Sequence, residues 1–289
     1  MLSALIKTMR PRQWTKNGFV FFGLIFDKQL FLIQPFLRTL GGFALFCLIS
    51  SAVYLFNDIA DVEADRNHPE KKFRPIASGK LPMGVALTTA ILLTVIAIPV
   101  GYLLSPIFAL ILTIYLVINL LYSRWLKHVS ILDVLIISSG FVLRVAAGVA
   151  LITVERFSPW LYMITVLFSL YIGFGKRRAE MNLLAQGASS HRKVFEGYTI
   201  PLLDQYITIV SGMTIVAYSL YTFSAPNLPD NHTMMLTIPF VVYGIFRYLQ
   251  LIQIGHAAGA PDEVALKDRP LQITVLLWCL TVIAIFYLS

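Results

Sequence analysis

The sequence predicts an all-α membrane protein, a polytopic bundle of transmembrane helices. Of its 289 residues, 57% are hydrophobic and only 13% are charged, and the mean hydropathy is +0.76. Soluble domains carry about 25% charged residues, so this composition excludes an ordinary soluble enzyme and a disordered protein. The two cysteines, Cys47 and Cys279, lie in apolar runs, which excludes a disulfide framework and a cysteine metal site. We expect a single domain, residues 1–289.

Nine apolar stretches are long enough to cross a bilayer, whose core of about 30 Å needs roughly 20 helical residues. The first is short, because Asp27 and Lys28 limit it, and the residues before Arg10 are compatible with an interfacial helix instead. The nine stretches lie near 13–29, 36–56, 84–104, 106–122, 131–153, 159–175, 202–223, 234–254 and 270–288.

The charges give the expected orientation, because Lys and Arg accumulate in cytoplasmic loops. With the N-terminus inside, 19 of the 23 Lys and Arg residues fall on the cytoplasmic side, and so do 12 of the 15 Asp and Glu residues. The orientation rule does not require the acids there. The concentration of both basic and acidic residues on the cytoplasmic side favours an enzyme in the inner or plasma membrane. Such an enzyme would handle metal-bound anions from the cytoplasm.

An acidic motif, NDIADVEAD, ends the second stretch. At 100° per helical residue, Asp58, Asp61 and Asp65 share a face about 60° wide, with Asn57 beside them and Glu63 turned away. Three such carboxylates repel one another unless a cation lies between them, and Mg²⁺ prefers oxygen ligands shared with substrate phosphates. The motif predicts a Mg²⁺–diphosphate site, with Asp58 and Asp61 as candidate catalytic residues. The alternative is a solvated helix end whose acids align by chance.

A basic loop supplies the counter-charge. Lys72, Arg74 and Lys80 follow the acidic motif, and Ser78-Gly79 permits a tight turn that presents backbone N–H groups to an anion. We expect the three cations to hold the phosphates of a donor substrate. For any one of them, the positive-inside bias alone is an equally good explanation.

Together, NDxxDxxxD, the following RPIASGKL, the nine spans and YSxxLK near residue 125 resemble the UbiA superfamily of intramembrane prenyltransferases. The similarity covers essentially the whole chain. It implies a UbiA-like helical fold with a cytoplasm-facing cavity, a Mg²⁺ cofactor, and substrate contacts at Tyr122, Arg124 and Lys127. Within the superfamily, RPRQWTKN near the start and GKRRAE near residue 177 are similar to members that transfer phosphoribose.

One departure from the superfamily pattern bears on the substrate. Typical members carry a second acidic motif, DxxxD, after the sixth span, whereas this chain reads KRRAE at 176–180. One acidic and one basic motif suit two anions, a Mg²⁺-bound diphosphate and a metal-free phosphate held by Lys and Arg. A stop-transfer cluster at the inner interface is the alternative. The acceptor phosphate is assigned to Arg10, Lys16, Lys176, Arg177 and Arg178.

The fifth span contains two charges, Asp133 and Arg144. They lie on one helical face with Gly140 between them, because eleven residues complete three turns and 20°. A charge at the bilayer centre costs about 2.5–3.5 kcal/mol, so Arg144 should face a polar cavity or a carboxylate. A phosphate ligand and a structural ion pair are equally compatible with Arg144, and Asp133 is counted among the substrate-binding residues.

The sequence thus predicts Mg²⁺-dependent transfer of 5-phosphoribose from phosphoribosyl diphosphate (PRPP) to a decaprenyl-type polyprenyl monophosphate, for cell-envelope polysaccharide precursors. Because the attacking lipid phosphate is already an anion, positioning and charge neutralisation suffice without a strong base. Two alternatives stay open: a UbiA-type prenyltransferase with an aromatic or haem-like acceptor, and a transporter with charges along a pathway. Nucleic acid is not expected as a partner, and a homo-oligomer is compatible with the sequence.

Overall fold

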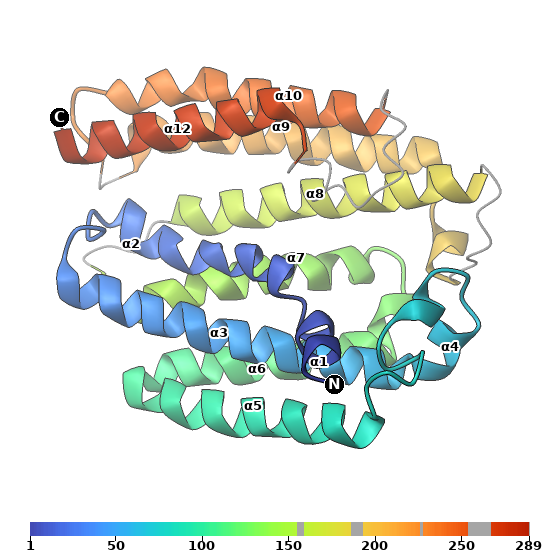
Figure 1. Ribbon diagram of the computed structural model, residues 1–289. Helices are drawn as coiled ribbons and strands as arrows, with labels where there is room; N and C mark the ends of the chain where they lie inside the picture. Colours follow the sequence, from blue (N-terminus) through green and yellow to red (C-terminus); the bar gives the residue numbers. More distant parts are fainter. Residues whose placement is uncertain (155–158, 186–192, 226–227, 254–266, 289) are drawn as a thin grey trace. The chain divides into compact units, whose positions relative to one another are not determined.

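The computed structural model describes residues 1–154, 159–185, 193–225, 228–253 and 267–288, and in these residues it contains helices and no β-strand (Figure 1). The chain divides into two compact units. Unit 1 holds residues 1–127 and 140–154, and unit 2 holds residues 128–139 and the described residues from 159 onward. The all-helical prediction is confirmed for the described residues.

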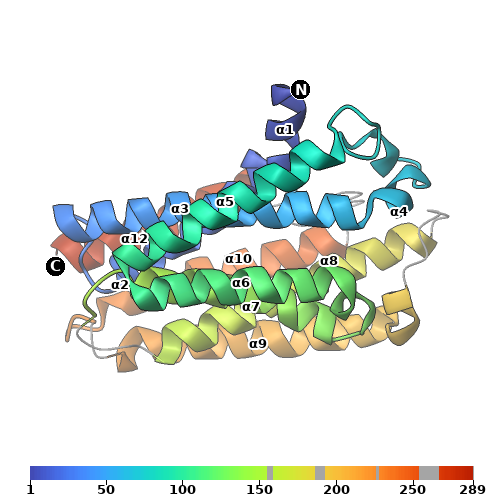
Figure 2. The same cartoon turned by 90° about the horizontal axis from the view of Figure 1, so that it is seen from below.

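Unit 1 is built around the long helix α3 (Ile33–Ala60), which packs against α5 and α6, as Figure 2 shows. Its core contains Phe46, Phe108 and Tyr115, all nearly inaccessible. The lipid is as apolar as these side chains, so close packing rather than water exclusion holds such helices together. The remaining elements are α1 (Leu2–Met9), η1 (Pro11–Phe21), α2 (Phe22–Phe26), α4 (Val62–Arg66), η2 (Lys71–Phe73), α5 (Met83–Leu104), α6 (Pro106–Arg124) and η3 (Leu126–His128).

Helix α7 (Leu132–Val149) contributes to both units, and its C-terminal half packs in unit 1. There Gly148 lies against η1 so closely that a Cβ atom would stand 1.8 Å from the carbonyl oxygen of Val20. Only glycine permits this approach, which is how the N-terminal segment reaches the interior of the unit.

Unit 2 is built from α8 (Pro159–Ala185), which packs along α9 (Ile200–Ser224), and from α10 (Ile238–Gln253) and α12 (Arg269–Leu288). The short segments η4 (Lys193–Gly197) and η5 (Thr233–Thr237) complete it. Tyrosines in this core direct their hydroxyl groups to neighbouring helices: Tyr171 donates to the carbonyl oxygen of Ile245 at 2.6 Å, and Tyr218 accepts from the Trp278 indole at 2.7 Å. Such bonds satisfy polar groups that lipid cannot solvate.

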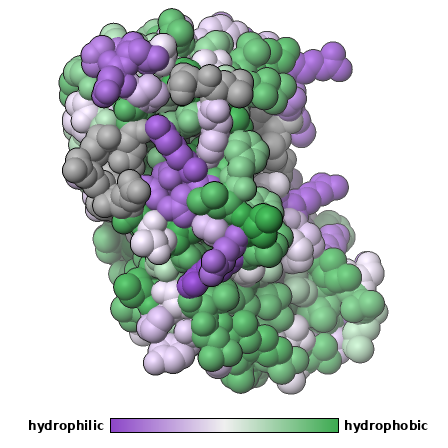
Figure 3. All heavy atoms as spheres, turned by 90° about the vertical axis from the view of Figure 1, so that its left-hand side faces the viewer, coloured by the Kyte–Doolittle hydropathy of each residue, from purple (hydrophilic) through white to green (hydrophobic). Residues whose placement is uncertain are grey.

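Seven helices in the described residues are long and apolar enough to span a bilayer. They are Ile33–Ala60, Met83–Leu104, Pro106–Arg124, Leu132–Val149, Ile200–Ser224, Thr233–Gln253 and Arg269–Tyr287. Their surfaces are apolar, with Leu103 of α5 83% exposed. Figure 3 views the molecule toward the helix ends, where hydrophilic side chains lie among hydrophobic ones. These helices therefore have the surfaces of lipid-facing spans.

Two of the nine expected spans are not among these seven. The stretch expected at 13–29 is divided between η1, of 11 residues, and α2, of 5 residues, and neither is long enough to cross a membrane. The stretch expected at 159–175 is part of α8, which has 27 residues but is not among the seven. The count of nine is thus not confirmed.

Candidate active site

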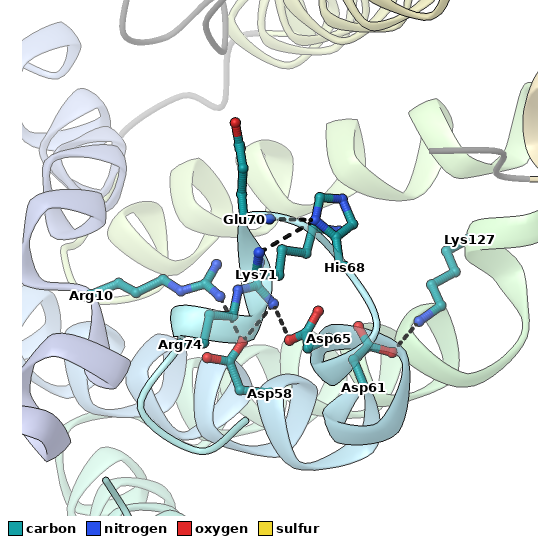
Figure 4. Close-up of polar contacts among 9 residues, drawn as sticks. All are labelled: Arg10, Asp58, Asp61, Asp65, His68, Glu70, Lys71, Arg74 and Lys127. Carbon is teal, nitrogen blue, oxygen red and sulfur yellow. Dashed lines mark hydrogen bonds and ion pairs between the residues drawn. The ribbon is translucent and has the colours of Figure 1, made fainter. Parts of the chain in front are cut away.

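The acidic motif lies where α3 ends and α4 begins (Figure 4). The helix in which the spacing of these aspartates was counted is interrupted at Asp61, although the N–H of Asp61 still donates to Asn57 at 3.0 Å and that of Asp65 to Asp61 at 2.8 Å. Val62, which follows the interruption, is buried in one cluster with Ile76 and Leu81 of the following loop. The interruption sets the directions of the three aspartates: Asp58 is in the last turn of α3, Asp61 at the junction and Asp65 in α4.

The three aspartates differ in exposure. Asp58 and Asp65 are each 3% exposed, whereas Asp61 is half-buried. Glu63 lies in the same short stretch but is exposed and pairs with Arg66 at 2.8 Å. The structure thus separates Glu63 from the other three acids, as the helical spacing indicated, although the helix is broken.

Each aspartate contacts a cation from another segment of unit 1. Arg10 donates to Asp58 at 2.6 Å, and Lys127, in η3 after α6, lies 2.6 Å from Asp61. We refer to the three aspartates and their three cations, Arg10, Arg74 and Lys127, as the acidic site. Its formal charges sum to zero.

Arg74 bridges two of the carboxylates (Figure 4). Its Nη1 atom lies 2.7 Å from Asp65 and 3.2 Å from Asp58. Backbone bonds on both sides hold Arg74 in place, because its N–H donates to Lys71 at 2.9 Å and its carbonyl accepts from Ser78 at 2.9 Å. Gly79 completes this loop with a φ of 76°, as the Ser-Gly prediction of a tight turn requires.

Arg10 is where the structure departs most from the expected assignment. The sequence placed it at the membrane surface with the acceptor phosphate, but its guanidinium lies on Asp58 and over the ring of Tyr54, 4.7 Å from the ring centroid. The segment that follows, η1, is hydrogen-bonded to α3. The Trp14 indole donates to Ser51 at 3.0 Å, and the Asn17 amide donates to Ser50 at 3.1 Å. The spacing of Trp14 and Asn17, three residues apart in η1, is the signal that could have placed these two side chains on one face.

The other candidates for substrate contact in unit 1 lie at or near the surface. Lys72 and Lys80 are exposed, and the ammonium group of Lys72 lies 5.2 Å from the centroid of the Phe73 ring. Arg124 is exposed and stacks on Trp125 at 5.6 Å. Lys16 and Tyr122 are partly buried, in η1 and at the end of α6.

The residues of the acidic site fit a magnesium ion by their chemistry. Asn57 offers a side-chain oxygen that is buried and has no hydrogen-bond partner among the described residues. It stands beside Asp58 in a set composed of oxygen ligands, which Mg²⁺ prefers to nitrogen or sulfur. Within the described chain, no three acidic, histidine or cysteine side chains lie close enough to hold one ion, since the carboxylates are directed to Arg74, Arg10 and Lys127 instead.

In unit 2, the buried carboxylate of Asp133 is bonded through both oxygens. Arg177, 3% exposed at its side chain, donates to one oxygen at 2.5 Å, and the Tyr198 hydroxyl donates to the other at 2.7 Å. Arg177 also contacts Glu180 at 2.6 Å. Burial, and then the bond to Asp133, raise the pKa of Tyr198 above its ordinary range. Both oxygens of Asp133 thus bind side chains of unit 2, which indicates that Asp133 stabilises the fold of this unit.

Tyr198 also holds a strained turn. Its hydroxyl accepts from the backbone N–H of Ile131, whose φ of 69° is the left-handed conformation that β-branched residues rarely adopt. The other arginine of the basic motif, Arg178, is nearly buried, donates to Asp204 and contacts the carbonyl oxygen of Ile252 at 3.2 Å. Both arginines therefore join helices within unit 2, while Lys176 is partly exposed.

Arg144 is 6% exposed in unit 1 and makes three hydrogen bonds to neutral acceptors. It donates to the Asn17 amide oxygen at 2.8 Å, the carbonyl of Gly140 at 2.7 Å and the Tyr115 hydroxyl at 2.8 Å. Three aromatic rings, including that of Phe46, surround the guanidinium at 4.9 to 5.6 Å. Neutral dipoles and ring faces thus stabilise this cation.

Comparison with known proteins gives the family. The UbiA prenyltransferase family model matches residues 18–264. The decaprenyl-phosphate phosphoribosyltransferases of Mycolicibacterium smegmatis, Mycobacterium tuberculosis and Corynebacterium glutamicum are 37%, 35% and 34% identical to this chain. The alignments cover 100%, 98% and 100% of this chain and 94%, 94% and 88% of those proteins.

Solved structures share the fold. A UbiA homolog from Archaeoglobus fulgidus bound to GPP and Mg²⁺ has a TM-score of 0.73 at 15% identity, over 98% of this chain and 99% of that chain. A digeranylgeranylglyceryl phosphate synthase structure has a TM-score of 0.69 at 18% identity, over 100% of this chain and 99% of the other. The full-length relatives are enzymes, so the transporter alternative is set aside. This chain is a membrane-embedded transferase and belongs to the UbiA prenyltransferase family.

Proposed function

We propose that this protein transfers 5-phosphoribose from PRPP to a decaprenyl-type polyprenyl monophosphate and releases diphosphate. Full-length relatives at 34–37% identity, named decaprenyl-phosphate phosphoribosyltransferase, support this substrate pair. The observation that carries the proposal is that Arg177 and Arg178 occupy the sequence position at which typical superfamily members carry a second acidic motif for a prenyl diphosphate. The oxygen ligands suited to Mg²⁺ are gathered in the acidic site of unit 1. We further propose that the product serves cell-envelope polysaccharide synthesis.

The donor is assigned to the acidic site. Asn57, Asp58, Asp61 and Asp65 would hold Mg²⁺, which when bound neutralises charge on the diphosphate leaving group. The cations that surround these acids, with Lys72 and Lys80 of the exposed loop, would contact the donor phosphates. Arginine suits this role because its planar guanidinium binds phosphate oxygens in pairs. Tyr122 and Arg124 are proposed to contact the remainder of the donor.

The acceptor assignment follows from the contacts in unit 2. Arg177 and Arg178 are bonded to carboxylates and nearly buried, so we assign them to holding the segment in shape. Lys176 is then proposed to receive the lipid phosphate. The assignment of each cluster rests on its own chemistry, since the two belong to different units.

The reaction exchanges one C1–oxygen bond for another. An oxygen of the lipid phosphate forms a bond to C1 of the ribose while the bond from C1 to the diphosphate oxygen breaks, and its electron pair leaves with diphosphate. No proton has to be removed from the anionic nucleophile. The chain therefore contributes positioning and charge, through arginine and lysine contacts to both anions, and no general base.

The orientation and the number of crossings also remain proposals: nine crossings, with the N-terminus and the acidic site in the cytoplasm. Cysteines introduced near Arg74 should react with an impermeant thiol reagent only from the cytoplasmic side, and one near Asn231 only from outside. Labelling of both positions from the same side would overturn this topology.

A product assay tests the proposed reaction. Purified protein in detergent is incubated with ribose-labelled PRPP, decaprenyl phosphate and Mg²⁺, and separately with a prenyl diphosphate and an aromatic acid. We expect a labelled lipid in the first mixture and no prenylated product in the second. A prenylated aromatic product, with no ribose-bearing lipid, would favour the prenyltransferase alternative.

A further inference from the structure

We infer that Arg10 and Arg74 are exchangeable cations of the acidic site, which make metal binding depend on the donor diphosphate. The arginines compete with a metal ion for the carboxylates and release them when a diphosphate offers replacement acceptors. Metal and donor then bind with positive coupling, and metal alone binds weakly. This inference rests on the proposed assignment of the donor to the acidic site.

The first argument is geometric. Nη1 of Arg74 contacts Asp58 and Asp65 at 3.2 and 2.7 Å, so it lies between two of the carboxylates that a shared metal ion would have to join. Arg10 contacts the same oxygen of Asp58, Oδ1, at 2.6 Å. A divalent ion on these oxygens would stand next to two guanidinium groups, and like charges at such distances repel strongly. The arginines and the metal therefore cannot share these oxygens in this arrangement.

The second argument is charge. The acidic site is formally neutral, so a divalent ion alone would leave it with two positive charges. A diphosphate brings several negative charges together with the metal and restores the balance. It also presents oxygens that match the fork of a guanidinium, so each arginine that leaves a carboxylate gains a charge-assisted hydrogen bond elsewhere.

The third argument is freedom of movement. The side chains of Arg10 and Arg74 are 32% and 29% exposed, so they can change acceptors without crossing a packed interior. Arg177, by contrast, is 3% exposed and enclosed by Asp133 and Glu180. The arginines at the acidic site are the ones that can change partners.

The backbone of Arg10 is held in place, whereas its side chain is partly exposed. It ends α1 in the left-handed conformation, with a φ of 53°, and the bonds from Trp14 and Asn17 to α3 hold the segment that follows. The guanidinium can thus change acceptors and still stay beside Asp58. This anchoring makes Arg10 a specificity-determining residue for a diphosphate-bearing donor.

Manganese binding tests the inference directly. Mn²⁺ is titrated into the purified full-length protein, with and without PRPP, and the free Mn²⁺ is measured by electron paramagnetic resonance. In wild type, the donor should tighten Mn²⁺ binding about tenfold or more, within the usual range of coupling between sites. Arg74→Gln should bind Mn²⁺ alone about 5-fold more tightly than wild type does, and should lose most of the tightening by PRPP.

Arg10→Gln is the second variant, in case Arg74→Gln does not fold, because Arg10 comes from a separate segment and changes one carboxylate contact only. The matched control is Arg66→Gln, which removes an arginine from the same region that pairs with the exposed Glu63. A tightening of Mn²⁺ binding in Arg66→Gln equal to that in the other two would mean that net charge alone is responsible, and would overturn the inference.

Asp65→Asn separates this inference from the proposed function. Loss of Mn²⁺ binding in Asp65→Asn, together with unchanged or weaker Mn²⁺ binding in both arginine variants, would overturn the exchange and leave the metal site standing. Mn²⁺ that fails to bind wild type even with PRPP would overturn the proposed donor site itself. Tighter binding in Arg74→Gln or Arg10→Gln, with Arg66→Gln unchanged, supports the exchange.

Discussion

Arginine–carboxylate contacts occur in two settings in this protein, and the contrast shows how burial decides their use. At the acidic site of unit 1, Asp58 accepts from two arginines whose side chains are about one-third exposed. In unit 2, Asp133 and Arg177 are 0% and 3% exposed and make one closed pair. Water can replace a lost partner in the first setting but not in the second. An arginine–carboxylate pair can therefore exchange partners at the acidic site, whereas the buried pair in unit 2 stabilises the fold.

The largest effect is expected from breaking the closed pair. Asp133→Ala would leave the Arg177 guanidinium buried without its main carboxylate, which should cost about 3–5 kcal/mol of stability. The thermal midpoint of the purified protein, followed by size-exclusion chromatography after heating, checks this. The double variant Asp133→Leu/Arg177→Met should recover most of the loss, because no buried charge remains. If Asp133→Ala is as stable as wild type, the claim that the buried pair stabilises the fold is contradicted.

The next effect concerns turnover. Asp58→Asn, Asp61→Asn and Asp65→Asn should each lower kcat by about 100-fold or more, because each removes a charge that the donor–metal complex needs. The thermal midpoints should change little. Glu63→Gln is the matched control in the same motif, since this carboxylate is exposed and directed to Arg66. An equal loss of kcat in Glu63→Gln would contradict the assignment of the three aspartates.

A smaller effect is expected from the turn that Tyr198 holds. Tyr198→Phe removes the hydroxyl that joins the Ile131 N–H to Asp133, and should cost about 1–3 kcal/mol because polar groups lose their partner. The effect should appear in the thermal midpoint and should be much reduced in the Asp133→Leu/Arg177→Met background. An unchanged midpoint in Tyr198→Phe would show that the turn does not depend on this bond.

The smallest effect is expected at the partly buried ion pair between Arg247 and Asp268, 2.8 Å apart. The bonds from Arg247 lower the pKa of Asp268 below its ordinary 3.8. A lowered carboxyl pKa stabilises the fold above the ordinary value, and that stabilisation disappears as the pH falls through the lowered one. Asp268→Asn should therefore lower the thermal midpoint slightly at pH 7 and not at a pH below the lowered pKa. The same difference at both pH values would contradict this sign.

The sequence predicted the helical fold and the acidic motif because both depend on local patterns. Long apolar runs define spans, and helical spacing separated Glu63 from its three neighbours. The break at Asp61 could not be predicted from helical spacing, which assumes an unbroken helix; the neighbouring Val62 is buried with Ile76 and Leu81. The first expected span is not confirmed, and its Asn17 side chain donates to Ser50 of α3, a contact that apolar content does not reveal.

The charge partners were the hardest to predict. Helical spacing grouped Asp133 with Arg144, whereas in the structure Asp133 pairs with Arg177, 44 residues away. Arg144 donates to neutral acceptors instead. Arg10 was assigned to a phosphate and contacts Asp58, 48 residues away. A buried charge can be recognised from sequence, but its partner depends on which helices pack together.

Donor binding in the absence of the lipid acceptor tests the central claim most directly. Titration calorimetry of PRPP into the purified protein, with Mg²⁺ present, should give binding to wild type and to Glu63→Gln with similar affinity. Removal of Mg²⁺ should weaken it strongly, and Asp61→Asn should weaken it at least tenfold, a loss of about 1.4 kcal/mol. PRPP binding of equal affinity with and without Mg²⁺, or in Asp61→Asn and wild type, would contradict the assignment of the donor to the acidic site.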